Sequence, residues 1–274
     1  MKNTLLLTEY NLRAIRRPLI WMFVLMGPLQ YGVMLAYLIK MKGPLFQPPH
    51  RLFMAGMSVP MVCILIGIML NFSIAMRQNG RSKAIYTLLT LPGKRFQVYF
   101  SSVCSGLVTV WLIAAVQALW YILLYVPMAH TIDWYSVHIL AEKVEKELIS
   151  AIPAYSSFVE NGFFLHLLRS PAMRMLFPMS VEGLAVMLVS EISVVTSLHS
   201  IAFTRGGLRV ISAICAIVCA ISTAVVLLET VEFLFIPILQ HSILWYVCRI
   251  AVQLCPAGLA AICAGYSLKH SKVL

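Results

Sequence analysis

The side chains best placed to do chemistry are two glutamates inside a long apolar run. Glu182 and Glu191 lie within residues 179–203, which otherwise hold mainly aliphatic and small side chains. If this run crosses a lipid bilayer, a charge near its centre costs about 2.5–3.5 kcal/mol, so such residues usually face a protein interior or a wet cavity. Arg249, in another apolar run, is a candidate counter-ion. Two interpretations stay open: a polar translocation path, or a structural ion pair or hydrogen-bonded helix contact.

The spacing of the two glutamates limits what they can do together. Nine positions separate them, so at about 100° per residue they point to nearly opposite faces of one helix. They therefore cannot form one pocket unaided. Several hydroxyl side chains add polarity beside Glu191, namely Ser190, Ser193, Thr196 and Ser197.

Motifs for other chemistries are absent from the sequence. It has no Gly-x-x-x-x-Gly-Lys-Ser/Thr phosphate loop, no His-Glu-x-x-His zinc motif and no Gly-x-Ser-x-Gly nucleophile elbow. The seven cysteines lie in apolar runs without polar co-ligands, which is typical of small buried hydrophobic residues. We therefore expect that the chain is not an enzyme and binds no metal or other cofactor.

The elements that must position these residues follow from composition. Apolar residues make up 61% of the chain and charged residues 11%, against about 45–50% and about 25% in ordinary soluble domains. Too little polar material is present to coat a soluble exterior. Six runs are long enough to cross a bilayer as helices: 18–39, 52–76, 98–125, 179–203, 210–228 and 243–268. We predict an all-α, polytopic membrane protein with six transmembrane helices and a single transmembrane domain, residues 1–274.

The distribution of basic residues predicts the orientation. With the N-terminus inside, the inner segments hold thirteen Lys and Arg against one acid, whereas the outer segments hold seven of each. Because Lys and Arg concentrate in cytoplasmic segments, both termini are predicted to be cytoplasmic. Nucleic acid is not an expected partner, since no basic stripe interleaved with aromatics lies on a soluble segment.

Two further segments are predicted to be amphipathic. Residues 1–17 form an N-terminal helix, and the long outer connection, residues 126–178, contains a helix that stops near Pro153. Its apolar positions recur at three- and four-residue steps: Trp134, Val137, Ala141, Val144, Leu148 and Ile152. We expect either an extracellular helical insert between spans three and four or a helix lying flat in the outer interface.

The inner connection between spans two and three carries a short apolar segment. Ser82 can cap a helix that Pro92 and Gly93 end. The side chains of interest are Ser82, Lys83, Ile85, Tyr86, Leu88, Leu89 and Leu91. This helix is too short to span, so it either lies on the membrane or inserts into a groove on a cytoplasmic partner.

This layout resembles the permease subunits of type-2 ABC exporters, in particular those of Gram-positive bacteria. Residues 1–17 look like the connecting helix of that family. Residues 82–91, with the run Tyr-Thr-Leu-Leu-Thr-Leu-Pro at 86–92, look like its coupling helix, which contacts the ATPase. In many relatives the large outer segment lies between spans five and six, whereas here it lies between spans three and four.

The resemblance implies partners that the chain does not encode. A second permease chain, identical or different, would complete a dimer in the bacterial cell membrane, surrounded by lipid. A separate cytoplasmic ATPase dimer would hold ATP and Mg. The exported substrate would be an antimicrobial peptide, a lipid or a drug-like amphiphile. The alternatives are an intramembrane enzyme with a metal-free site and a membrane sensor or scaffold without an ATPase partner.

Overall fold

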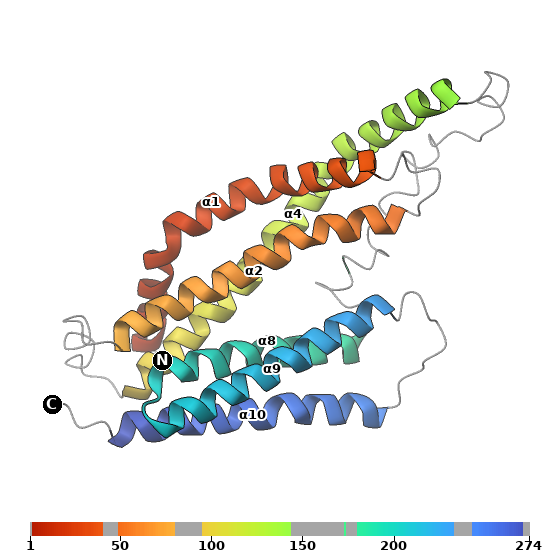
Figure 1. The fold of residues 1–274 in the computed structure, drawn as a ribbon. Coiled ribbons are helices and arrows are strands. Elements are labelled where there is room, and N and C mark those ends of the chain that lie inside the picture. Colours follow the sequence, from red (N-terminus) through yellow and green to blue (C-terminus); the bar gives the residue numbers. More distant parts are fainter. Residues whose placement is uncertain are drawn as a thin grey trace. The chain divides into compact units, whose positions relative to one another are not determined.

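The computed structural model describes residues 2–40, 49–79, 95–143, 173, 180–232 and 243–270. Within these residues the backbone is helical except at Ser180 and residues 204–206, and it forms no strand. Figure 1 shows the six long helices: α1 (Lys2–Lys40), α2 (Pro49–Asn79), α4 (Arg95–Lys143), α8 (Val181–Phe203), α9 (Gly207–Glu232) and α10 (Ile243–His270).

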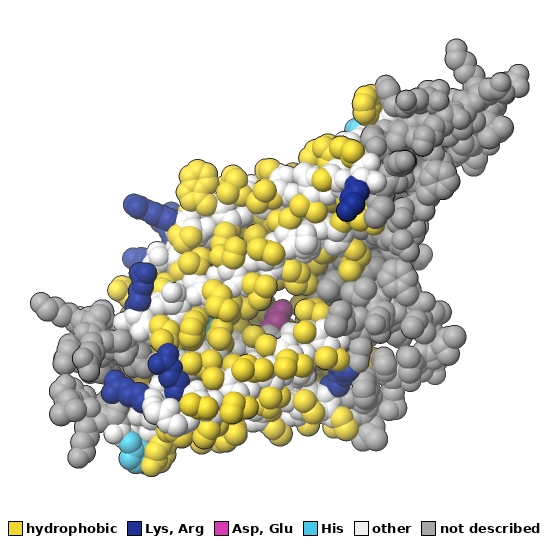
Figure 2. Space-filling model, in the orientation of Figure 1, with side chains coloured by type: hydrophobic (Ala, Val, Ile, Leu, Met, Phe, Trp, Pro, Cys, Tyr) yellow, Lys and Arg dark blue, Asp and Glu magenta, His cyan; other side chains and the backbone are white. Residues whose placement is uncertain are grey.

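Each of the six helices contains a stretch that is long and apolar enough to cross a membrane. Figure 2 shows hydrophobic side chains along the helices, with Lys and Arg near the helix ends. Such a surface is suited to lipid, because the hydrocarbon core accepts apolar side chains and excludes charges. The prediction of an all-α, multi-pass membrane protein is confirmed.

Two helices are longer than their predicted spans. The predicted connecting helix, residues 1–17, and the first span form one continuous helix, α1, although Pro18 lies between them. The third span was expected to end at Tyr125, but α4 continues to Lys143 with Pro127 inside it. A proline interrupts the helical hydrogen bonds without ending a membrane helix, because neighbouring groups satisfy the freed carbonyls.

These extensions bear on the predicted outer insert. Residues 126–143 are the last part of α4 and not the start of a separate helix. The rest of the predicted insert, apart from Met173, lies outside the described residues up to Ser180. Pro60 and Pro256 lie inside α2 and α10, so neither proline ends its helix.

The chain divides into two compact units. The first unit contains Met1–Leu19, Ile64–Leu112 and Pro178–Leu274; the second contains Ile20–Cys63 and Ile113–Phe177. Helices α1, α2 and α4 therefore contribute to both units, whereas α8, α9 and α10 belong to the first.

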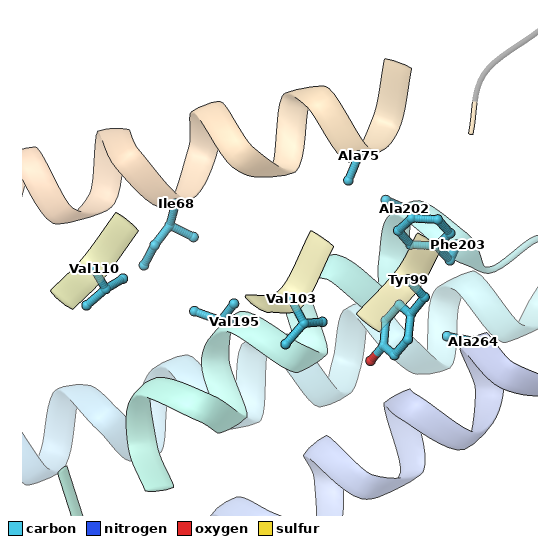
Figure 3. Packing of buried hydrophobic residues seen from close by; sticks show 9 residues of the cluster. All are labelled: Ile68, Ala75, Tyr99, Val103, Val110, Val195, Ala202, Phe203 and Ala264. Carbon is cyan, nitrogen blue, oxygen red and sulfur yellow. The ribbon is translucent and has the colours of Figure 1, made fainter. Parts of the chain in front are cut away.

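The core of the first unit forms where α2 and α4 meet the C-terminal helices. Helices α8, α9 and α10 pack against one another, and α8 is the most buried of the six spans. Figure 3 shows Tyr99 of α4 next to Phe203 and Ala264, and Val103 next to Val195. The Tyr99 ring meets the Phe203 ring edge-on at 5.5 Å between centroids, a geometry that aromatic pairs favour.

The polar composition of α8 follows from this central position. Its serines are buried. The hydroxyls of Ser190 and Ser197 donate to the carbonyls of Val186 and Ser193, one turn earlier, both at 2.7 Å. Such bonds satisfy hydroxyls where no water is available. The helix begins at Ser180, whose side chain accepts a bond from the Gly183 N–H, a regular N-cap.

The second unit is held by contacts between the C-terminal parts of α1 and α4. The Trp120 indole N–H donates to the Phe23 carbonyl at 2.8 Å. The Gln117 amide donates to the Gln30 carbonyl oxygen, also at 2.8 Å, and both amides are buried. The hydroxyls of Tyr31 and Thr131 share a hydrogen bond of 2.7 Å.

Candidate functional site

Glu191 lies near the midpoint of the 23-residue helix α8. Its Oε2 accepts a hydrogen bond of 2.9 Å from the indole Nε1 of Trp111 on α4. Both residues belong to the first unit. The structure therefore joins the central acid of one span to the aromatic ring of another.

The Glu191–Trp111 pair lies at the surface of the first unit and not in its core. Glu191 is half-buried, and 48% of the Trp111 surface is exposed. The exposed side chain of Leu188 lies one turn before Glu191 on the same face of α8. A carboxylate, an aromatic ring and an aliphatic side chain together suit a ligand with one positive charge and an apolar body.

The other two candidate residues, Glu182 and Arg249, also belong to the first unit. Glu182 lies in the first turn of α8 and is exposed, where the positive end of the helix dipole favours an acid. Arg249 is half-buried near the start of α10. The hydrogen-bond partner of Glu191 is thus an uncharged donor, Trp111, which sequence reasoning did not single out.

A second group of polar residues ties α2 to α4. The side-chain amide of Asn71 donates to the hydroxyl of Thr109 at 2.9 Å, and its oxygen accepts a bond from Ser105. All three side chains are buried. Each hydrogen bond between membrane helices contributes about 0.6 kcal/mol on average. Because these bonds form only when the three side chains are at the same level, they favour one register of α2 against α4.

A third group ties α10 to α8 and α9. The Gln253 amide donates to the hydroxyl of Ser190 at 2.7 Å, and the Cys219 thiol lies 3.7 Å from the Gln253 carbonyl. The side chains of Gln253, Ser190 and Cys219 are buried. These contacts join α8, α9 and α10 at one level and stabilise the C-terminal part of the first unit.

His199 on α8 is a fully buried titratable side chain. Its ring Nδ1 lies 2.8 Å from the Val195 carbonyl, and the ring packs against Gly106 of α4. No three His, Cys, Asp or Glu residues within the described part of the chain lie close enough to hold a metal ion. A packing role accounts for His199 in this arrangement.

The N-terminal part of α1 has one face buried in the first unit and another face exposed. Thr8, Asn11 and Ile15 are buried in the first unit, and the Thr8 hydroxyl donates to the Ser101 carbonyl at 3.4 Å. Exposed residues on the remaining surface are Leu5, Leu6, Tyr10, Arg13, Arg16 and Arg17. Apolar and basic side chains side by side are typical of a helix at a membrane surface.

The predicted coupling helix, residues 82–91, lies outside the described residues. The structure describes its two flanking helices, since α2 ends at Asn79 and α4 begins at Arg95. Comparison of the chain with protein-family models, with curated proteins and with solved structures found no match. The chain is a multi-pass membrane protein. Any finer function must be argued from its own residues.

Proposed function

We propose that this membrane protein is the permease subunit of an ATP-driven exporter whose ATPase is a separate cytoplasmic protein. The observation that carries the proposal is the connection between α2 and α4. Both helices are membrane spans, and only residues 80–94 join them. Consecutive spans cross in opposite directions, so this connection returns on one side of the membrane and is free to meet a soluble partner.

The charges around this connection favour the cytoplasmic side. The sequence places basic residues at both of its ends, namely Arg77, Arg81, Lys83, Lys94 and Arg95. Such residues collect on the cytoplasmic side of membrane proteins. With six spans, both termini then lie in the cytoplasm as well, and an ATPase has access to the connection.

The apolar residues between these charges supply the docking surface. Residues 82–91 would form a short helix with Ile85, Tyr86 and Leu89 among its apolar side chains. A groove on an ATPase accepts such a helix through a few apolar anchors. ATP and Mg would be bound by that ATPase, since this sequence has no phosphate loop.

The two helices beside the connection are suited to transmit its movement. The Asn71 amide bonds to Thr109 and Ser105 within the first unit, so the inner ends of α2 and α4 are tied together. A push on residues 82–91 would therefore move both helices as one body. Closure of the ATPase dimer would shift two such permease chains, identical or different, between discrete arrangements.

Binding of the ATPase tests this proposal. The tagged full-length chain is purified from its native membrane, with and without the double substitution Tyr86→Asp and Leu89→Asp. Burying one large apolar side chain contributes about 1.5–3 kcal/mol, so two buried carboxylates should reduce the ATPase that co-purifies by at least about tenfold. The matched control carries Tyr155→Asp and Leu165→Asp in the predicted outer connection and should retain the ATPase. Equal recovery of the ATPase with both variants would contradict the proposal.

A further inference from the structure

We propose that Glu191 and Trp111 form a binding site for the ammonium group of a membrane-soluble organic cation. The inference deepens the proposed function and rests on it in one respect, namely that such cations are the class of substrate that the permease carries. The site itself, and the chemistry of its ligand, follow from the described residues.

The first argument is charge balance. Glu191 lies near the middle of a membrane span, where a lone carboxylate is unfavourable. The described side chains give it one hydrogen-bond partner, the neutral indole N–H of Trp111. A neutral donor orients the carboxyl group and supplies no positive charge to its ionised form. A cationic ligand supplies that charge when it binds.

The second argument is the orientation of the aromatic ring. Trp111 uses its Nε1 edge to bond Glu191, while 48% of its surface remains exposed. The faces of an indole ring attract cations within about 6 Å of the ring centre, and trimethylammonium groups are bound in this way. One ligand group therefore meets the carboxylate and the ring together.

The third argument is the apolar surroundings. Leu188 lies one turn before Glu191 on the same face of α8, and 36% of its surface is exposed. An aliphatic side chain at this position accepts the hydrocarbon part of a ligand that enters from the lipid. Glu182 lacks these features, because it is exposed in the first turn of α8 and faces no aromatic partner among the described residues.

Binding of hexyltrimethylammonium tests the site without the ATPase. The full-length chain is placed in nanodiscs of neutral lipid, binding is measured by titration calorimetry, and the signal of empty nanodiscs is subtracted. Glu191→Gln should raise the Kd at least about tenfold, because the charge is lost. The matched control Glu182→Gln should leave it unchanged. An uncharged isostere with a tert-butyl group should bind the wild-type chain at least about tenfold more weakly.

Substitutions of Trp111 separate ligand binding from a structural role. Trp111→Phe keeps an aromatic face and loses the N–H, whereas Trp111→Leu loses both. If the ring binds the cation, the Kd should rise more for Trp111→Leu than for Trp111→Phe, by about threefold or more. Thermal unfolding of each variant, followed by circular dichroism, shows whether the fold is kept.

Two results would overturn the inference: equal affinity of Glu191→Gln and the wild type, or equal affinity for the cation and its uncharged isostere. Either would leave the ATPase proposal intact, because residues 82–91 take no part in this measurement. Conversely, a chain that binds the cation but recruits no ATPase would keep the site and lose the exporter.

Discussion

Replacing Gly27 with alanine is expected to destabilise the folded chain by about 1–3 kcal/mol. A Cβ atom on Gly27 would overlap three ring carbons of Trp120, Cδ2, Cε2 and Cε3. The ring cannot move aside freely, because its Nε1 donates to the Phe23 carbonyl at 2.8 Å. The Phe23 carbonyl lies one turn before Gly27, in the part of α1 where Pro28 disrupts the regular helical hydrogen bonds. The substitution therefore either breaks this hydrogen bond or separates α1 from α4.

The matched control for this prediction is Gly32→Ala on the same helix. A Cβ on Gly32 would meet nothing within 4 Å, so alanine there should be neutral or stabilise by up to about 1 kcal/mol through helix propensity. Unfolding in increasing sodium dodecyl sulfate, followed by tryptophan fluorescence, measures both variants. Adding Trp120→Leu to Gly27→Ala should lower the cost of the alanine, since the clash partner is gone. Equal stability of the two single variants would show that Trp120 does not lie against Gly27.

A valine at position 106 is expected to destabilise the first unit by about 3 kcal/mol or more. A Cβ on Gly106 would lie 2.7 Å from Cγ1 of Val195 and 3.0 Å from Cε1 of His199. Val195 and His199 are fully buried on α8, and the His199 ring is held by the Val195 carbonyl. Neither side chain has space to swing away, so α4 and α8 must separate. Valine adds two more methyl groups at the closest point of this contact.

Gly258 on α10 provides the control for this second substitution. It is exposed, and a Cβ there would meet nothing within 4 Å. Gly258→Val introduces the same side chain into a membrane helix without a clash, so it should change the free energy of unfolding by less than about 0.5 kcal/mol. If Gly106→Val were as stable as Gly258→Val, the packing of α4 against α8 described above would be wrong.

The six membrane helices could be predicted from the sequence because lipid demands long apolar stretches. Their ends could not be predicted equally well. Helices α1 and α4 continue past the predicted boundaries at Arg17 and Tyr125. Neither a proline nor an amphipathic pattern ends a membrane helix when neighbouring groups satisfy its backbone hydrogen bonds. Helix α8 was predicted as a span despite Glu182 and Glu191 within it, and it is the most buried of the six spans, with Ser193 and Ser197 fully buried.

The candidate site could be predicted only in part. A charge within an apolar run marks Glu191 directly. Its partner Trp111 lies 80 positions away, and neither spacing nor charge points to it; the search for an opposite charge led to Arg249 instead. The close contact of Gly106 with His199 could not be predicted either. A glycine within a helical stretch indicates a low helix propensity, but it does not indicate which residue packs against it. The prediction of a coupling helix over residues 82–91 is based on the sequence pattern alone.

ATP hydrolysis by the reconstituted complex is the most direct test of the central claim that a separate ATPase drives this permease. The full-length chain and the ATPase that co-purifies with it are placed together in lipid vesicles. The double variant Tyr86→Asp and Leu89→Asp should reduce hydrolysis at least about tenfold, to the rate of the ATPase alone. The outer control, Tyr155→Asp and Leu165→Asp, should keep the wild-type rate. A hydrolysis rate that is the same with the wild-type chain, with the double variant and without any permease would contradict the account.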